Sequence, residues 1–293
     1  MVKISVITPS FNQDKYIERT IQSVLSQNIN DFEYIVMDGA SSDKTVSILK
    51  SYSSYLKFIS EPDNGQAHAV NKGIKMSSGE IIAWINSDDI YYPNTFKKVI
   101  KFFDENPNVD ILYGNANHIN ATDHFIDSYP SESFSLKKLK ETCYFCQPAV
   151  FFRKKCISTY GMLNESLNFC MDYDLWLRFA LQGASFAYLP DIFSGSRLYP
   201  ETKTIGSPVA ATKEAVFMLK KNLNYVPTRW LYNYASCSIQ NNNSINVINF
   251  KFYIKVYVKF IKESFLKNGF FRGLMNIFVL PIIKINHILR NKI

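Results

Sequence analysis

The sequence predicts an α/β fold, a Rossmann-type mixed and mainly parallel sheet flanked by helices, with a basic helical extension at its C-terminal end. Three observations favour this class. Short apolar runs alternate with amphipathic stretches up to about residue 195, which is typical of βαβ units. Hydrophobic residues make up 47% of the 293 residues, so a large core is available and disorder is excluded as the chain's main character. Basic residues, finally, gather near the C-terminus.

The expected strands are short, rich in β-branched or aromatic residues, and bounded by polar or turn residues. In chain order they are Ile4–Thr8, Phe32–Met37, Leu56–Ser60, Glu80–Asn86, Asp110–Tyr113, Gln147–Arg153 and Ser185–Leu189. The helices expected between and after them are Gln13–Gln27, Asp43–Ser53, Ala67–Met76, Asn94–Asp104 and Asp172–Gln182. In the first helix, Ile17, Ile21, Val24 and Leu25 recur at helical spacing, which predicts one face packed on the sheet.

Charge divides the chain into two predicted parts, an α/β domain at 1–222 and a basic, aromatic-rich helical segment at 223–293. The second part carries ten Lys and Arg residues against one acid, Glu263. The total of +8 therefore separates into a nearly neutral first part and a strongly basic second part. The basic balance is evidently a property of the C-terminal segment alone.

Acidic clusters follow three of the predicted strands, at the edge of an open α/β sheet where ligands bind. They are Asp38–Asp43, Glu61–Gln66 and Ser87–Asp89. Asp38 ends a buried strand before a glycine, and we expect its carboxylate to point into the crevice, with no local group for it to cap. For Asp43, which stands just before a helix, capping is the favoured interpretation.

The adjacent carboxylates of Asp88 and Asp89 repel each other unless a cation or ligand donors stabilise them. They suggest a divalent metal, Mg²⁺ or Mn²⁺, held by one or two carboxylates together with substrate phosphates. The alternative is a surface turn before the helix that starts near Asn94.

A succession of motifs resembles family 2 glycosyltransferases with the GT-A fold, over about residues 1–205. The motifs are Thr8-Pro9-Ser10-Phe11-Asn12, Asp38-Gly39-Ala40-Ser41-Ser42-Asp43, Asp63-Asn64-Gly65-Gln66 with Asn71-Lys72-Gly73, Asn86-Ser87-Asp88-Asp89, and Met171-Asp172-Tyr173-Asp174-Leu175-Trp176-Leu177-Arg178. Each motif alone is weak, but together, in this order and spacing, they are specific. The resemblance implies a GT-A-like fold and an inverting transfer of a sugar from a nucleotide diphosphate donor, with a divalent metal on the diphosphate.

The resemblance also implies roles for single residues on the donor side. Pro9 and Asp38 are similar to nucleotide contacts, with Asp38 accepting a hydrogen bond from the base, commonly uracil. Asp88 is similar to the residue nearest the ribose, and Asp89 to the metal ligand, which Asp88 adjoins. Gln66 and Lys72 match more variable positions beside the nucleotide.

Asp172 aligns with the family's catalytic base. The chemistry agrees, because an inverting displacement needs a base for the acceptor hydroxyl and a cation for the departing diphosphate. A helix start also favours the ionised carboxylate that a base requires. The alternative is that Asp172 only caps the helix behind it. Asp174 and Arg178, at i and i+4, are expected to form a pair on the helix face.

One departure from the family pattern concerns an Arg-x-His that many relatives carry downstream, where the histidine can help to bind the metal or diphosphate. Tyr199 stands at the expected histidine position, and a neutral tyrosine is a poor metal ligand. Arg197 and Lys203 are the remaining candidates for diphosphate contacts, as charged donors. None of the four histidines forms a pair with metal-ligand spacing.

In the C-terminal segment, Lys251, Lys255, Lys259 and Lys262 fall on one face of a predicted helix whose other sides are aromatic and aliphatic. Such a helix is a known form of interfacial membrane anchor, so we expect residues 245–293 to contact an anionic membrane surface. The alternative is that these helices pack on the catalytic domain or on a second subunit. Gly273–Ile283 is too short an apolar stretch to span a membrane.

The sequence thus predicts an enzyme that moves a hexose or N-acetylhexosamine from a nucleotide sugar, with a UDP-sugar favoured, to a saccharide or lipid-linked saccharide in surface polysaccharide or glycolipid synthesis. The sparse, irregular cysteines and the absence of a signal peptide predict a cytoplasmic protein, peripheral on the cytoplasmic face of the membrane. A sugar-phosphate nucleotidyltransferase is the alternative. Nucleic-acid binding is disfavoured, because residues 1–222 are slightly acidic and carry no recognisable nucleic-acid motif.

Overall fold

The computed structural model describes residues 2–242 and 250–290, which form two compact units. The first unit comprises residues up to 135 together with 144–200, and the second comprises 136–143 together with 201–293. The division therefore lies earlier than the predicted boundary at 222/223. The physical reason is that α9 (Pro208–Leu223) packs against α10 (Thr228–Asn242), so its buried face belongs to the core of the second unit.

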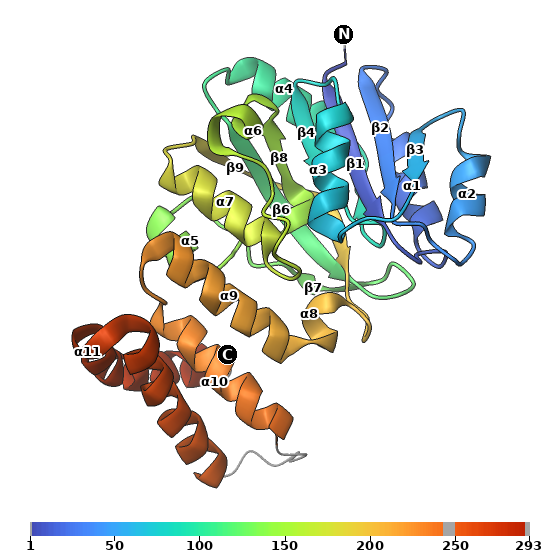
Figure 1. Ribbon diagram of the computed structural model, residues 1–293. Coiled ribbons are helices and arrows are strands. Elements are labelled where there is room, and N and C mark those ends of the chain that lie inside the picture. Colours follow the sequence, from blue (N-terminus) through green and yellow to red (C-terminus); the bar gives the residue numbers. More distant parts are fainter. Residues whose placement is uncertain (1, 243–249, 291–293) are drawn as a thin grey trace. The chain divides into compact units, whose positions relative to one another are not determined.

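The first unit contains a nine-stranded mixed sheet with the order β3-β2-β1-β4-β8-β6-β9-β5, while β7 pairs with β6 (Figure 1). The strands are β1 Ile4–Ser10, β2 Phe32–Asp38, β3 Lys57–Ser60, β4 Ile81–Trp84, β5 Ile90–Tyr91, β6 Ile111–Ile119, β7 Phe125–Ser128, β8 Val150–Arg153 and β9 Phe186–Arg197. Strands β3, β2, β1 and β4 run parallel, whereas β8 is antiparallel to both β4 and β6. The predicted α/β class with a mixed sheet is confirmed.

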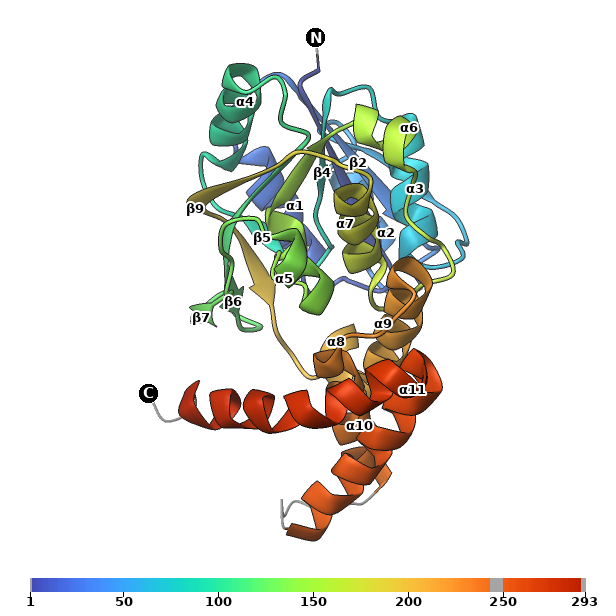
Figure 2. The ribbon, with the colours of Figure 1, turned by 90° about the vertical axis from the view of Figure 1, so that its left-hand side faces the viewer.

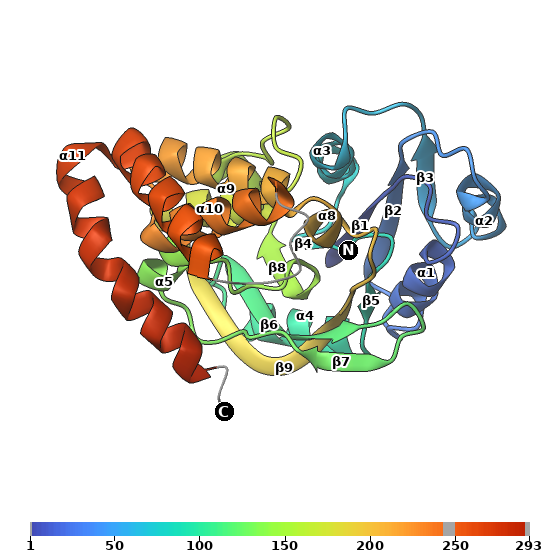
Figure 3. The ribbon, with the colours of Figure 1, turned by 90° about the horizontal axis from the view of Figure 1, so that it is seen from below.

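Helices cover both faces of the sheet. The cluster on one face joins α1 (Ile17–Leu25), α2 (Thr45–Ser51) and α4 (Thr95–Glu105) to alternate residues of β1, β2 and β4. On the other face, α3 (Gln66–Met76) packs on β1 and β2, and Trp176 of α7 (Met171–Leu181) packs on Phe152 of β8. Figure 3 shows α1 and α3 on opposite sides of β1. Short elements complete this unit: the 3₁₀ turn η1 (Gln147–Ala149) and α6 (Lys155–Tyr160).

Two elements differ from the predicted ranges in ways that matter for the site. The first helix begins at Ile17 rather than Gln13, because residues 11–16 form a loop in which Asn12 has a left-handed φ of 52°. Strand β9 continues to Arg197, well past the predicted end at Leu189, and pairs with both β6 and β5. Its last residues are thereby brought beside the segment that follows β4.

The second unit consists of helices: α5 (Leu136–Glu141), α8 (Lys203–Gly206), α9, α10 and α11 (Phe250–Arg290). Its core includes Val216, Leu231 and Phe260. Figure 2 shows α11 bent into two segments, and the bend falls at Gly269, whose φ of 73° is readily adopted by glycine. The side chain of Asn268 fixes the bend, since it exchanges two hydrogen bonds of 2.7 Å with the backbone of Val226.

Among the helices of residues 2–242 and 250–290, none combines the length and the apolar character needed to cross a bilayer. All five cysteines are free thiols, and Cys146, Cys156 and Cys170 are buried.

Candidate active site

The strand order places a crevice at the carboxyl ends of β1 and β4. The chain leaves β1 through α1 on one face of the sheet and reaches β4 through α3 on the other, so the connections diverge between these two strands. Ligands bind at such switch points in α/β sheets. Pro9 and Ser10 end β1 there, and the buried Ser10 hydroxyl has no hydrogen-bond partner within the part of the chain that the structure describes.

The carboxylate of Asp38 at the end of β2 is buried and engaged by local donors. Its Oδ1 accepts a hydrogen bond of 2.5 Å from the Ser41 hydroxyl. Its Oδ2 accepts bonds from the Ser41 amide at 3.0 Å and from the Ser60 hydroxyl at 2.6 Å. The expectation that Asp38 has no local group to cap was wrong, because the turn after β2 and the end of β3 both supply donors. Its contact with a base stays a prediction.

The loops after β1 and β2 are joined by further hydrogen bonds. The Asn12 amide donates to the Ser41 hydroxyl at 2.8 Å, and the Ser42 amide donates to the Asn12 side-chain oxygen at 2.9 Å. Asp43 receives the amides of Asp14 at 3.0 Å and Thr45 at 2.9 Å. The N-cap of α2 is Lys44, so the prediction that Asp43 is the helix cap was wrong by one residue, although its carboxylate accepts the first amide of the helix and also holds the neighbouring loop.

Asp89 faces the protein interior. Its Oδ1 accepts the backbone amide of Arg197 at 2.8 Å, and its carbonyl accepts the hydroxyl of Thr20, on α1, at 2.7 Å. The side-chain amide of Asn86 lies 3.4 Å from its Oδ2. Burial first, and the negative charge of Asp88 second, raise the pKa of the Asp89 carboxyl well above its ordinary value. The predicted role of Asp89 as the metal ligand stays a prediction.

Asp88 takes the opposite position, with a half-exposed side chain. Its Oδ2 accepts a hydrogen bond of 2.8 Å from the phenol of Tyr199, two residues beyond the end of β9. Its backbone carbonyl accepts Nε of Arg197 at 2.7 Å. The two adjacent carboxylates thus point to different surroundings, and Asp88 is the more accessible of the two.

Arg197 is 2% exposed and directs its guanidinium at protein acceptors. Besides the carbonyl of Asp88, it binds the carbonyl of Asn120 at 2.7 Å and forms an ion pair with Asp123, both in the turn between β6 and β7. The guanidinium carbon also lies 4.8 Å from the centre of the Tyr16 ring. Through these contacts Arg197 holds the segment after β4 against the turn between β6 and β7. The predicted contact with a diphosphate stays a prediction.

Gln66 and Lys72 lie on α3, beside the same edge of the sheet. The Gln66 side chain donates to the side-chain oxygen of Asn86 at 2.7 Å, which brings it to the segment that carries Asp88 and Asp89. Lys72 forms an ion pair with Glu61, just after β3. Lys203 is the first residue of α8 in the second unit, so its predicted role at the diphosphate is left as a prediction.

Asp172 is the second residue of α7, with a half-buried side chain in the first turn. The N-cap is Cys170, so the alternative that Asp172 is the helix cap is excluded. The loop before α7 reaches the start of α3, since a Cβ added to Gly65 would lie 3.7 Å from the side-chain oxygen of Asn168. Asp172 therefore follows a loop held at the carboxyl edge of the sheet.

The predicted pair of Asp174 and Arg178 is confirmed, with a Nε to Oδ2 distance of 2.8 Å. Arg178 also donates to the carbonyls of Tyr160 at 3.0 Å and Met162 at 2.7 Å. This pair anchors the chain between α6 and α7 and so fixes the helix that carries Asp172.

Two buried side chains near the crevice were missed as candidates for supporting the site. Asn71 of α3 bonds the carbonyl and amide of Leu163, both at 3.0 Å, and the carboxylate of Glu165 at 2.7 Å, and so holds the loop before α7. Gln147 donates to the carbonyl of Trp84 at 2.6 Å, while its Oε1 is buried without a hydrogen-bond partner in the described chain. Asn71 belongs to the Asn71-Lys72-Gly73 motif, whereas the only sequence signal of Gln147 is a polar residue beside an apolar run.

The donor set at the end of β4 suits a hard divalent cation. Within residues 2–242 and 250–290, no three His, Cys, Asp or Glu side chains lie close enough to hold a metal by themselves. Mg²⁺ is usually bound through one or two carboxylates and completed by substrate phosphates. The half-exposed carboxylate of Asp88 matches that mode, in which the diphosphate supplies the remaining oxygen ligands.

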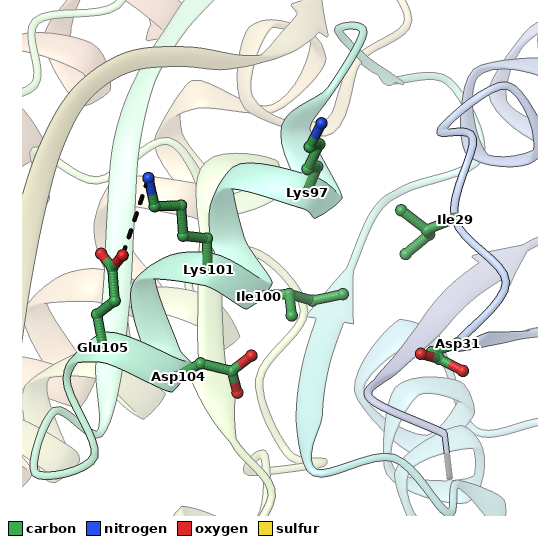
Figure 4. A pocket seen from close by; sticks show the side chains of 7 residues that line it. All are labelled: Ile29, Asp31, Lys97, Ile100, Lys101, Asp104 and Glu105. Atoms are coloured by element: carbon green, nitrogen blue, oxygen red, sulfur yellow. Dashed lines mark ion pairs between the residues drawn. The ribbon is translucent and has the colours of Figure 1, made fainter.

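A separate pocket of about 380 Å³ lies at the other end of the sheet (Figure 4). Ile29 and Asp31 of the segment before β2 and Ile100 of α4 line it, together with Lys97, Lys101, Asp104 and Glu105. It adjoins the amino ends of the parallel strands, away from Asp88 and Asp172. The pocket is therefore not part of the candidate active site.

Comparison of the fold with solved structures gives two similar chains. The Staphylococcus aureus protein TarS, residues 1–349 in complex with UDP-GlcNAc, has a TM-score of 0.62 at 18% identity, covering 89% of this chain and 81% of that one. The mannosyltransferase PcManGT of Pyrobaculum calidifontis, in complex with GDP-Man and Mn²⁺, has a TM-score of 0.60 at 15% identity, covering 97% and 80%. The predicted GT-A-like fold is confirmed.

Sequence comparison finds relatives that match part of this chain over part of their own length. An uncharacterised glycosyltransferase of Rickettsia typhi is 29% identical over 214 residues, which cover 69% of this chain and 65% of that protein. The chondroitin synthase of Escherichia coli is 27% identical over 206 residues, 69% of this chain but 30% of that enzyme. The chain thus spans less than two thirds of either relative. The sequence profile described as Glycosyl transferase family 2 matches residues 5–161, more than half of the chain and a range that includes Asp38, Asp88 and Asp89, and the chain therefore belongs to that family.

Proposed function

We propose that the chain is an inverting glycosyltransferase that moves a sugar from a nucleotide diphosphate sugar to a hydroxyl of a saccharide or lipid-linked saccharide. The observation that carries the proposal is the placement of two half-exposed carboxylates, Asp88 and Asp172, on separate elements at one edge of the sheet. Asp88 belongs to the segment after β4, which a hydrogen bond from Arg197 holds in place, and Asp172 lies in the first turn of α7. Two carboxylates held apart can serve different roles in one displacement.

On the donor side, Asp88 is proposed to hold Mg²⁺ or Mn²⁺, with Asp89 positioning it from the interior. When bound, the cation supplies charge stabilisation to the departing diphosphate. Pro9 and Ser10 end β1 at this edge of the sheet, and the buried Ser10 hydroxyl has no hydrogen-bond partner among the described residues. Asp38 shapes the neighbouring loop at the proposed base site, and Gln66 borders the segment that bears Asp88.

On the acceptor side, Asp172 is proposed to act as general base. Its carboxylate takes the proton from the acceptor hydroxyl while the acceptor oxygen bonds to the anomeric carbon and the bond to the diphosphate oxygen breaks. The products are the inverted glycoside, the nucleoside diphosphate and a protonated Asp172. The first turn of α7 favours the charged carboxylate, since the N-terminal end of a helix carries partial positive charge.

A UDP-sugar is the favoured donor, and surface polysaccharide or glycolipid synthesis the favoured setting. The complex of TarS with UDP-GlcNAc and the similarity to a chondroitin synthase support these choices. The test is to incubate the full chain with a panel of nucleotide sugars and Mg²⁺ or Mn²⁺, and to identify the nucleotide released. Release of UDP with a glycosylated acceptor is expected, whereas release of pyrophosphate from UTP and a sugar phosphate would identify a nucleotidyltransferase instead.

We also propose that the second unit attaches the enzyme to an anionic membrane surface, peripherally on the cytoplasmic face. The carrying observation is an exposed apolar group around the bend of α11, in which Leu266, Phe270 and Phe271 are 66%, 67% and 83% exposed. Exposed basic side chains flank it, namely Lys262, Lys267 and Arg272. Apolar side chains beside basic ones are typical of interfacial helices. The remaining residues of 245–293 are in part outside the described chain.

The lysines predicted to lie on one exposed helix face differ in their exposure. Lys255 and Lys262 are exposed, but Lys259 is half-buried with its ammonium 5.1 Å from the centre of the Tyr234 ring. The Lys251 side chain lies outside the described residues. Val256 and Phe260 pack inside the second unit, so the alternative of internal packing holds for that side of the helix.

Flotation with anionic vesicles tests the attachment. The double variant Phe270→Ser, Phe271→Ser should reduce the vesicle-bound fraction at least fivefold, since each benzyl side chain contributes about 1.5–3 kcal/mol when it leaves water. The control is Phe125→Ser, a phenylalanine of similar exposure in the β7 hairpin, which should bind like the parent. Equal flotation of the double variant and the parent would refute the membrane role of the bend.

A further inference from the structure

The residue that meets Asp88 from the other side of the crevice is Tyr199. Its backbone lies two residues past the end of β9, and its phenol donates to Oδ2 of Asp88 at 2.8 Å. Its ring centre lies 4.9 Å from that of Tyr16. The ring is therefore supported by an aromatic neighbour while the hydroxyl covers one oxygen of the carboxylate.

Tyr199 acts as a donor and not as a cation ligand. Its hydroxyl donates to the Asp88 carboxylate at 2.8 Å, with its ring against Tyr16. The side chain of Gln13 also hydrogen-bonds the phenol. A protonated phenol donates well to a carboxylate, whereas Mg²⁺ and Mn²⁺ select carboxylate, carbonyl and water oxygens.

The backbone around Asp88 is held by several hydrogen bonds. The carbonyl of Asp88 is bonded to Arg197, and the next residue, Asp89, is bonded through its carboxylate to the Arg197 amide and through its carbonyl to Thr20. Just after the end of β9, the Leu198 amide donates a backbone hydrogen bond of 2.8 Å to the carbonyl of Ile119, the last residue of β6. Tyr199 comes directly after that bond.

We propose that Tyr199 caps Asp88 and competes with the divalent cation for its Oδ2, so that this tyrosine sets the metal affinity of the enzyme. The inference rests on the proposed metal site at Asp88 and deepens it. Without donor, the hydroxyl occupies the carboxylate oxygen and free metal binds weakly. When the donor diphosphate supplies further oxygen ligands, Tyr199 would release the carboxylate, so that metal and donor would bind together.

The test is a titration of the full chain with Mn²⁺ alone, followed by the electron paramagnetic resonance of free Mn²⁺ and by calorimetry. Tyr199→Phe keeps the ring and removes the donor, and should tighten Mn²⁺ binding about tenfold, the order expected when a hydrogen bond to a charged group is removed from a competing state. The matched control is Tyr16→Phe, the same change on the neighbouring ring, which should leave Mn²⁺ affinity within about twofold of the parent.

Asp88→Asn separates failure of this proposal from failure of the metal site. Loss of Mn²⁺ binding in Asp88→Asn, with tighter binding in Tyr199→Phe, supports both. Loss in Asp88→Asn with unchanged or weaker binding in Tyr199→Phe overturns the cap and leaves the metal site standing. Unchanged Mn²⁺ binding in Asp88→Asn places the metal elsewhere and overturns both. Thermal unfolding of each variant checks that the fold is retained.

Discussion

Asp38 and Asp88 both follow a buried strand of the parallel half of the sheet, and both lie at its carboxyl edge. Asp38 is buried and accepts three hydrogen bonds from Ser41 and Ser60. Asp88 is half-buried, and its Oδ2 accepts the phenol of Tyr199, on a segment that follows the end of a strand. The same residue type at the same edge of the sheet is used for the fold in one place and is more accessible in the other.

The difference shows what decides the use of a carboxylate at a strand end. The turn after β2 supplies an amide and a hydroxyl within three residues of Asp38, and β3 adds a second hydroxyl from the adjacent strand. After β4, the interior donors go to Asp89 instead, through the amide of Arg197. Asp88 is left facing the crevice because its neighbour takes the interior position.

The largest expected effect is that of Asp172→Asn, which removes the proposed base and keeps the shape of the side chain. Transfer should fall about 10³-fold, within the range for general base catalysis, and donor affinity should stay within about twofold of the parent. Initial rates and calorimetric titration of the donor measure the two quantities. A variant as active as the parent would exclude Asp172 as the base.

The variant Asp174→Asn, two residues further along the same helix, provides a contrast to Asp172→Asn. This change breaks the buried pair with Arg178 and should lower the melting temperature. Below that temperature, transfer per folded molecule should remain near that of the parent, because Asp174 holds the helix and faces no substrate in our proposal.

The comparison of the two strand-end aspartates predicts opposite phenotypes. Asp88→Asn should reduce Mn²⁺ affinity at least tenfold and leave the free energy of unfolding within about 0.5 kcal/mol, as for other surface changes. Asp38→Asn should cost about 1–3 kcal/mol of stability, because its amide group would face the donors of Ser41 or Ser60, and should leave Mn²⁺ affinity without nucleotide unchanged. Urea unfolding measures the free energy of unfolding of both variants, and Mn²⁺ titration measures their affinity for Mn²⁺. Similar phenotypes in both assays would refute the division of roles.

Much of the fold and the candidate residues could be predicted because their signals are local. Alternating apolar runs gave the strands of the parallel half, and acids at strand ends marked Asp38, Asp88 and Asp89. The resemblance added Asp172, at a helix start that the structure confirms.

The use of each carboxylate could not be predicted, because the partners lie far away in the chain. Tyr199 is 111 positions from Asp88, and Arg197 is 108 positions from Asp89. Both contacts depend on β9 continuing to Arg197 beside β5, and the polar stretch Ser194-Gly195-Ser196 concealed that extension. The same strand extension explains why Arg197 is a buried clamp, whereas the sequence suggested a free cation.

The smallest expected effect concerns Asp43, a second carboxylate used for the fold. Burial acts to raise its pKa, but hydrogen bonds from Thr45 and from the Asp14 amide outweigh burial, so the pKa of Asp43 is lowered. A carboxyl with a lower pKa in the folded state stabilises the protein above its unfolded value, near 3.8, and this contribution is lost as pH falls through the folded pKa. Asp43→Asn should therefore cost about 1 kcal/mol at pH 7, and the difference from the parent should shrink in acid. Urea unfolding at pH 7 and about pH 3.5 measures the free energy of unfolding of this variant and of the parent. The control is Asp31→Asn, at an exposed position. If the difference in unfolding free energy between Asp43→Asn and the parent is the same at both pH values, the charge of Asp43 is not what holds the two loops together.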